Sequence, residues 1–222
     1  MTTVAQKRNT QSAPKLVKRA EGQLPTIVGY AAVYYDANDP GTEYRLYSDM
    51  VERIKPGAFD RAVREDDVRG LFNHEECNVL GRTASGTMRL MTDARGLMYE
   101  IDPPDTQTGR DTVTSLQRGD VTGSSFMFLP LRTTWSEERT TDGKVTYIRT
   151  LEEVQLFDCG PVTFPAYDST EAGTRSTSEL EDVRAELEAW KRSKGDSTSD
   201  MQRDLDLIEV LAMEIELSET AG

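Results

Sequence analysis

The chain contains a single histidine, His74, and this limits the chemistry that it can perform with an imidazole. A proton transfer near neutral pH that needs an imidazole must use this residue. His74 follows the apolar segment 68–72 and stands between Asn73 and Glu75. A histidine at the end of a strand can face a cleft, although a plain surface position fits the same pattern. His74 is therefore the first candidate catalytic residue.

Two adjacent serines, Ser124 and Ser125, offer a candidate nucleophile. They follow Gly123 and precede Phe126, so a strand is expected to begin beside them. A hydroxyl held at the rim of a sheet can act as a nucleophile when a base lies nearby. The G-x-S-x-G pattern of α/β-hydrolases is missing, because Phe126 and Met127 follow the second serine. A Gly-Ser turn without any catalytic role is the alternative.

A carboxylate would be needed to orient the histidine, and the segment 151–167 offers three. Asp158 stands at the end of an alternating, strand-like pattern. Beside an imidazole, such a carboxylate fixes the tautomer and stabilises the imidazolium that forms as a serine loses its proton. Glu152 and Glu153 lie on the same segment and are its rivals.

The charge of the chain excludes several kinds of partner. Lys and Arg number 26 against 39 Asp and Glu, which gives a net charge of −13. Such an excess repels phosphate backbones and anionic lipids, so neither nucleic acid nor a membrane is expected as a partner. The sequence shows neither an apolar run long enough to cross a bilayer nor the apolar middle of a secretory signal. A cytoplasmic location is expected.

The two cysteines, Cys77 and Cys159, fit a reducing compartment. With one histidine they cannot complete a four-ligand zinc site unless carboxylates fill in, so no metal and no cofactor is expected. A cysteine nucleophile is the less favoured alternative to serine, because Cys77 lies only three residues from His74 and Cys159 adjoins Asp158.

The elements that must position these residues are mostly short strands. Helices are expected after the Pro56-Gly57 turn and over 106–118. Many strands with few helices favour an α+β fold, a mainly antiparallel sheet curling into a barrel with helices packed outside. The expected strands are 26–35, 68–72, 87–91, 96–101, one after the serines, 145–149 and 153–157.

Composition divides the chain into three parts. Residues 1–24 are polar and lack periodicity, which predicts a flexible N-terminal arm. Residues 25–170 would form the catalytic domain, and 171–222 an acidic helical extension. Apolar residues of the extension recur at coiled-coil spacing near 180–190 and 205–215, so a helical hairpin or a self-associating coiled coil is expected there.

Seven blocks, kept in order over residues 26–170, resemble the prohead (capsid maturation) protease family of tailed bacteriophages. No single block is diagnostic, and the order makes the resemblance specific. The blocks are GYAAVY at 29–34, KPGAF at 55–59, FNHE at 72–75, LGRT at 80–83, GL at 96–97, GDVTGSSF at 119–126 and GPVTFPAY at 160–167.

The resemblance implies a serine endopeptidase whose fold is related to the herpesvirus assembly proteases, a β-barrel wrapped by helices. Such enzymes act inside the prohead, in the bacterial host cytoplasm, where they cut the scaffold region from the major capsid protein and commonly cut themselves. The family's histidine falls on His74 and its acid on Asp158. Its nucleophile falls on Ser125, with Ser124 as the near alternative. The herpesvirus relatives use a second histidine, which this chain lacks, so either an acid takes that place or the third member is absent.

Two further expectations concern the surroundings of the catalytic residues. Backbone N–H groups that face the developing oxyanion are expected near Gly81 and Arg82 or near Gly123. A tight turn with an exposed arginine explains the LGRT block equally well. The acidic helices could bind the capsid shell or its scaffold, so the alternative function is a non-catalytic assembly or scaffolding factor that acts through them.

Overall fold

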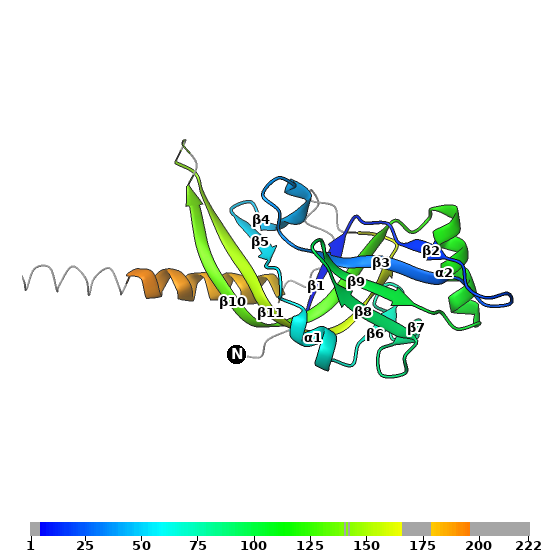
Figure 1. Cartoon of the computed structure of the whole chain (residues 1–222). Coiled ribbons are helices and arrows are strands. Elements are labelled where there is room, and N and C mark those ends of the chain that lie inside the picture. The colour runs from blue at the N-terminus through cyan, green and yellow to red at the C-terminus, as the bar shows by residue number, and fades with distance from the viewer. Residues whose placement is uncertain (1–4, 140, 142, 166–178, 196–222) are drawn as a thin grey trace, which may run out of the picture. The chain divides into compact units, whose positions relative to one another are not determined.

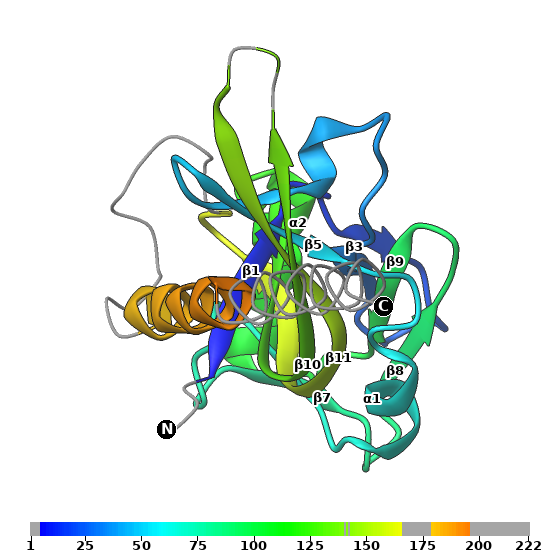
Figure 2. The same ribbon diagram turned by 90° about the vertical axis from the view of Figure 1, so that its left-hand side faces the viewer.

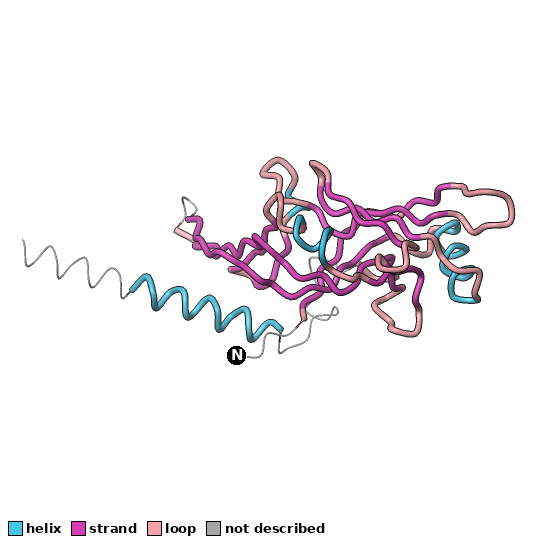
Figure 3. Tube along the Cα trace, turned by 60° about the horizontal axis from the view of Figure 1, so that its bottom comes forward, coloured by secondary structure: helices cyan, strands magenta, loops and turns pink. Residues whose placement is uncertain are grey.

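The structure, a computed structural model, describes residues 5–139, 141, 143–165 and 179–195 (Figure 1). The chain divides into two compact units, Met1–Leu180 and Glu181–Gly222. Strands make up most of the first unit (Figure 3), and the fold is α+β, as predicted. None of the described helices is long and apolar enough to cross a membrane.

The larger sheet has seven strands and is built around one long strand, β11 (Val145–Val162). β11 pairs antiparallel with β10 (Gly123–Arg139) and parallel with two shorter strands. The path β1-β10-β11-β5-β4 is joined by β6 and β7 at the other end of β11. The shorter strands are β1 (Gln6–Thr10), β4 (Tyr44–Tyr47), β5 (Met50–Ile54), β6 (Arg69–Leu71) and β7 (Val79–Arg82).

The smaller sheet has four antiparallel strands in the order β2-β3-β9-β8. Its hairpin β8–β9 confirms the one predicted over 87–101. A helix confirms the prediction for 106–118, and a short helix follows the Pro56-Gly57 turn as expected. These elements are β2 (Lys15–Val17), β3 (Thr26–Val33), β8 (Met88–Thr92), β9 (Gly96–Ile101), α1 (Asp60–Glu65), α2 (Gln107–Arg118) and the 3-10 helix η1 (Pro40–Thr42).

The prediction of a closed barrel is wrong. Closure requires the first and last strands of a sheet to pair with each other. Among the described residues the larger path ends on β1 and β4 and the smaller one on β2 and β8, and neither pair of end strands is joined. The larger sheet is also mixed, because β5 and β6 run parallel to β11. The sequence pattern locates strands but not the partner of each, so it could not distinguish two open sheets from one closed sheet.

The flexible arm predicted for residues 1–24 is also wrong where the structure describes it, because this segment contributes β1 and β2. β1 buries Gln6, Arg8 and Thr10 and leaves the residues between them partly exposed. This alternation is that of a strand, but its inward residues are polar. Hydropathy therefore gave no sign of it.

Residues 179–195 are helical where the first helix of the acidic extension was expected. The predicted domain boundary near 170 and the second helix, near 200–217, lie outside the described residues. The division into domains and the pairing of two helices stay predictions.

The aromatic core fixes the strand that carries the two serines. Phe126 meets Phe59 edge to face at 5.6 Å between ring centroids and stacks on Phe128 at 4.9 Å. Side chains alternate between the two faces of a strand, so Ser124 points into the core with these rings. Ser125 consequently points to the opposite face.

Candidate active site

The loop that carries His74 has an unusual backbone. Asn73 and His74 have φ angles of 55° and 59°, in the left-handed region that non-glycine residues rarely adopt. A non-glycine residue in this conformation destabilises the fold by roughly 1–2 kcal/mol, although asparagine tolerates it better than most residues. Strain of this kind persists where the surroundings impose it, and it is concentrated at functional sites.

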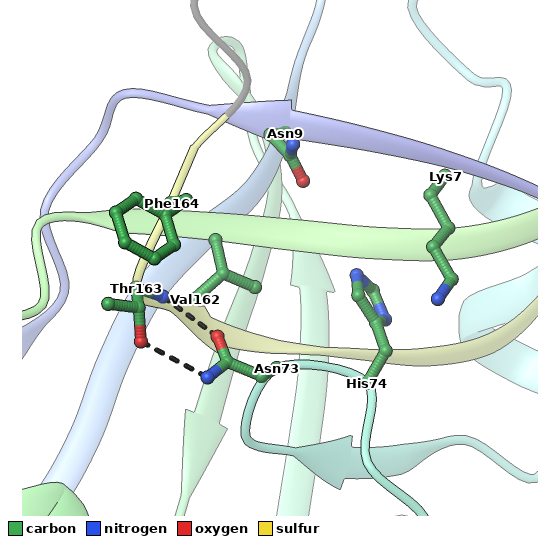
Figure 4. Close-up of a pocket in the computed structure, with 7 residues that line it drawn as sticks. All are labelled: Lys7, Asn9, Asn73, His74, Val162, Thr163 and Phe164. Carbon is green, nitrogen blue, oxygen red and sulfur yellow. Dashed lines mark hydrogen bonds between the residues drawn. The ribbon is translucent and has the colours of Figure 1, made fainter. Parts of the chain in front are cut away.

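The side chain of Asn73 fastens this loop to the end of β11 (Figure 4). Its Oδ1 accepts from the Thr163 backbone N–H at 2.8 Å, and its Nδ2 donates to Thr163 Oγ1 at 3.1 Å. The Asn73 N–H donates to the Pro161 carbonyl at 3.1 Å. Close approach is possible because a Cβ on Gly160 would lie 2.1 Å from the Leu71 carbonyl oxygen, so only glycine fits there. The imidazole is thereby held against β11.

The structure brings the histidine, one serine and one carboxylate together. His74 Nε2 lies 2.5 Å from Ser125 Oγ, and His74 Nδ1 lies 2.5 Å from Asp158 Oδ1. Ser125 is on β10, and Asp158 is on β11 opposite Met127. These contacts join residues 51 and 84 positions apart in the sequence. Hydroxyl, imidazole and carboxylate form one continuous chain of hydrogen bonds.

This chain is almost completely shielded from water. Ser125 is 0% exposed, and the side chains of His74 and Asp158 are 8% and 3% exposed. Among the described residues none donates a hydrogen bond to Oδ2 of Asp158, although that atom is buried. Buried polar atoms nearly always have a hydrogen-bond partner, so this unpaired carboxylate oxygen lowers the stability of the fold.

Ser124, the alternative nucleophile, lies on the other face of β10. Its Oγ is 2.9 Å from the Tyr99 hydroxyl and 3.5 Å from the carbonyl of Ser12, and the residue is fully buried. Burial raises the pKa of Tyr99, which therefore keeps its proton. The only histidine of the sequence contacts the other serine, so within the described part of the chain Ser124 has no imidazole beside it.

The rival acids have other partners. Glu152 and Glu153 both pair with Arg132, each at 3.0 Å. Cys77 is exposed and Cys159 is buried. Burial, reinforced by the neighbouring Asp158, raises the pKa of the Cys159 thiol well above its usual value, which disfavours the thiolate that a cysteine nucleophile needs.

The expected oxyanion donors lie on two different strands. Gly81 and Arg82 are on β7, and the Arg82 N–H donates to Thr87 Oγ1 at 3.0 Å. The Arg82 guanidinium pairs with Asp67. Gly123 is on β10 itself, two residues before the serine that contacts His74. The backbone N–H of Arg82 thus already has an acceptor, and Gly123 is the candidate nearest to Ser125 along the chain.

A cavity of about 230 Å³ opens beside the imidazole (Figure 4). It reaches His74 but is not lined by Ser125. Phe164, 75% exposed, forms part of its wall. The lining residues are Lys7, Asn9, Asn73, His74, Val162, Thr163 and Phe164.

Sequence reasoning missed two residues at this site. One is Asn73, whose type was itself a signal, because asparagine is enriched in left-handed conformations. The other is Arg8, whose backbone carbonyl lies 3.0 Å from Ser125 Oγ. The polar sequence of the N-terminal segment gave no indication of that contact. Among the described residues no group of three or more histidine, cysteine or carboxylate side chains is arranged to hold a metal ion.

Comparison with known proteins gives a family. The family model described as caudovirus prohead serine protease matches residues 12–185, more than half of the chain. A solved structure, the capsid assembly protease gp21 of bacteriophage T4, aligns with a TM-score of 0.42 and 11% identity, over 73% of this chain and 97% of that one. No curated protein sequence is significantly similar. The matched region includes every residue of the hydrogen-bonded chain described above, and the chain belongs to the caudovirus prohead serine protease family and is a serine protease.

Proposed function

We propose that this protease cleaves peptide bonds with Ser125 as nucleophile, His74 as general base and acid, and Asp158 as the residue that orients the imidazole. The observation that carries the proposal is the unbroken path from Ser125 Oγ through both ring nitrogens of His74 to Asp158 Oδ1. The same geometry defines catalytic triads on unrelated folds, whatever the order of the residues along the chain.

The chemistry follows from the contacts. Ser125 Oγ attacks the scissile carbonyl carbon while its proton passes to His74 Nε2. When the C–N bond breaks, that proton goes to the departing amine, and the acyl group stays on Ser125 as an ester. Water then attacks the ester, gives its proton to His74 Nε2, and releases the carboxylic acid and the serine hydroxyl. The bonds formed and broken balance without a cofactor.

Asp158 supports these steps through the other ring nitrogen. An N–H at His74 Nδ1 that donates to Asp158 Oδ1 leaves Nε2 free to accept the serine proton. The near absence of water strengthens the attraction between Asp158 and the imidazolium that forms. Backbone N–H donors near Gly123 would stabilise the oxyanion, and the loss of one such donor typically lowers the rate by about 10²–10³.

The substrates proposed are the scaffold region of the major capsid protein and the protease itself, cut inside the prohead in the host cytoplasm. Family membership supports this setting. A fold relationship to the herpesvirus assembly proteases, and self-association or capsid binding through the acidic C-terminal helices, belong to the same proposal. The non-catalytic assembly factor is not retained, because the chain belongs to a family of serine proteases.

The test is co-expression of the full chain with its capsid protein, followed by mass spectrometry of all new termini. Wild type should produce cut capsid protein, and Ser125→Ala should produce none. Ser124→Ala is the matched control, because it removes the same hydroxyl from the adjacent residue, and it should still cut. Cutting by Ser125→Ala, or loss of cutting only in Ser124→Ala, would overturn the assignment. New termini within the protease chain would reveal self-cleavage.

A further inference from the structure

The proposed nucleophile is closed off by the N-terminal strand. β1 pairs antiparallel with β10 (Figure 2). In this pairing Asn9 lies opposite Ser125. This pairing covers the edge of β10 at the serine, which is 0% exposed. The cavity beside His74 does not reach Ser125, and two β1 residues, Lys7 and Asn9, form part of its wall. A peptide cannot meet the hydroxyl while β1 holds this position.

β1 also competes for the serine proton. Ser125 Oγ lies within hydrogen-bonding distance of two acceptors, His74 Nε2 at 2.5 Å and the Arg8 carbonyl at 3.0 Å. A hydroxyl has one proton to donate. Donation to Arg8 would withhold that proton from the imidazole, so the N-terminal strand both covers the serine and can divert its proton.

A buried ionic cluster fastens β1 in place. The Arg8 guanidinium donates to both oxygens of Glu52, at 2.6 and 3.2 Å, and is completely buried. It also pairs with Glu179, at the start of the helical segment 179–195. Arg149 of β11 donates to Glu52 at 2.7 Å. The side chain of Arg8 thus anchors the same residue whose carbonyl meets the nucleophile.

We propose that the edge of β10 at Ser124–Phe128 is the binding site for an extended stretch of substrate polypeptide, and that β1 occupies this site in the closed enzyme. A sheet edge binds such a segment through its backbone N–H and C=O groups. β1 already makes this kind of pairing, in register from Gln6↔Phe128 to Thr10↔Ser124. Release of residues 6–10 bares the edge of β10 and the serine hydroxyl together. This inference rests on the proposed role of Ser125 and adds how access to that residue is controlled.

The experiment locks β1 onto β10. Lys7 and Met127 are paired across the two strands, and directly opposed Cα atoms of antiparallel strands lie within the range that a disulfide spans. The full chain carries Lys7→Cys and Met127→Cys in a Cys77→Ser background, which removes the exposed native thiol. A fluorophosphonate probe, which bonds to an activated serine with loss of fluoride, reports access to Ser125. Mass spectrometry verifies the cross-link and the labelled residue.

The reduced variant should label at Ser125 at least about tenfold faster than the oxidised one, because the rate scales with the open fraction. Adding a reductant to the oxidised form should restore the faster rate. The Cys77→Ser protein without the two new cysteines should label equally under both conditions. Equal rates in the cross-linked and reduced forms would overturn the occlusion and leave the role of Ser125 intact. Failure of the cross-link to form would contradict the pairing of β1 with β10.

Absence of labelling at Ser125 in wild type and in both forms of the variant would contradict the proposed function, and the occlusion with it.

A second pair of variants tests the latch, that is, the ionic cluster around Arg8, without new cysteines. Glu179→Gln removes one of the two carboxylates that hold Arg8 and should label several-fold faster than wild type. Glu181→Gln makes the same change at an exposed residue nearby and should match wild type. Identical rates for the two variants would overturn the role of the ionic cluster as the latch.

Discussion

Two buried polar networks meet at Arg8, and they are built in opposite ways. The ionic cluster holds Glu52 between Arg8 and Arg149, so both carboxylate oxygens are bonded to guanidinium groups. Burial alone would raise the pKa of Glu52, but these two arginines lower it below its usual value. The ionic cluster is close to saturated with hydrogen bonds, as a buried network must be to avoid a large cost.

The hydrogen-bonded chain from Ser125 through His74 to Asp158, which we propose is catalytic, is incomplete by comparison. Asp158 Oδ2 is buried without a partner among the described residues, and His74 sits on a left-handed backbone. Unsatisfied atoms and strained angles each cost free energy, so the fold must stabilise them from elsewhere. We infer that the ionic cluster serves the integrity of the fold, whereas the chain proposed to be catalytic lowers stability in favour of reactivity. Variants of the Ser125–His74–Asp158 chain should therefore change kcat, whereas variants of the ionic cluster should change stability and, through β1, access to Ser125.

The largest effect is expected from the proposed nucleophile and the proposed base. Ser125→Ala or His74→Ala should lower kcat by roughly 10⁶, because neither residue works without the other. For Ser125→Ala, the free energy of unfolding in urea should shift by no more than about 1.5 kcal/mol, the net worth of a typical hydrogen bond. Peptide hydrolysis and urea melts measured side by side would test this. A large loss of stability with modest loss of rate would reverse the proposed division between the networks.

The orienting acid should come next. Asp158→Asn keeps the shape of the side chain but can stabilise the wrong tautomer of His74, so kcat should fall by about 10⁴. Glu153→Gln is the control, since that residue pairs with Arg132 instead of the histidine, and its kcat should match wild type. Equal effects of the two substitutions on kcat would remove Asp158 from the mechanism.

The ionic cluster should respond in stability. Glu52→Gln leaves two buried guanidinium groups short of a carboxylate and should cost about 3–5 kcal/mol in the free energy of unfolding. The pKa of Glu52 is lower in the folded state than its usual value of 4.5. The contribution of Glu52 to the free energy of unfolding is therefore fully present above pH 4.5 and is lost as the pH falls through the pKa of the folded state. The gap in stability between wild type and Glu52→Gln should therefore narrow in acid. A gap that stays constant from pH 7 to pH 3 would contradict the cluster's electrostatic role.

The smallest effect is expected at Asn73, a positioning residue. Asn73→Ala removes both side-chain bonds to Thr163 and should lower kcat by about 10²-fold or less, because small displacements of a catalytic group are costly. KM should change little. Asn78→Ala, in the same loop, is the control. A rise in KM without a change in kcat would mean that Asn73 contacts substrate instead of placing the imidazole.

The sequence indicated which residues meet at the candidate site more completely than it indicated the fold around them. A single histidine, a tandem of serines and one strand-end acid left few combinations, and the order of the family blocks selected among them. The hairpin β8–β9 and the helix α2 followed from periodicity and turn residues. These features are local, so local patterns reveal them.

The features of the fold that the sequence did not predict depend on contacts between residues that are far apart in the chain. β1 looked like a polar arm because its inward residue, Arg8, is buried only through pairing with Glu52, 44 positions away. The prediction of a barrel was wrong because the sequence pattern of a strand does not identify the strand with which it pairs. In the structure β5 and β6 both pair with β11 in parallel. Ser124 and Ser125 were separable only once Phe126 fixed which face of β10 turns to the core.

The role of Ser125 as the nucleophile is tested most sharply by the site at which a fluorophosphonate bonds to the full chain, read by peptide mass spectrometry. We expect one adduct, on Ser125, that disappears in His74→Ala and persists in Ser124→Ala. An adduct on Ser124, or one on Ser125 that forms equally well without His74, would contradict it.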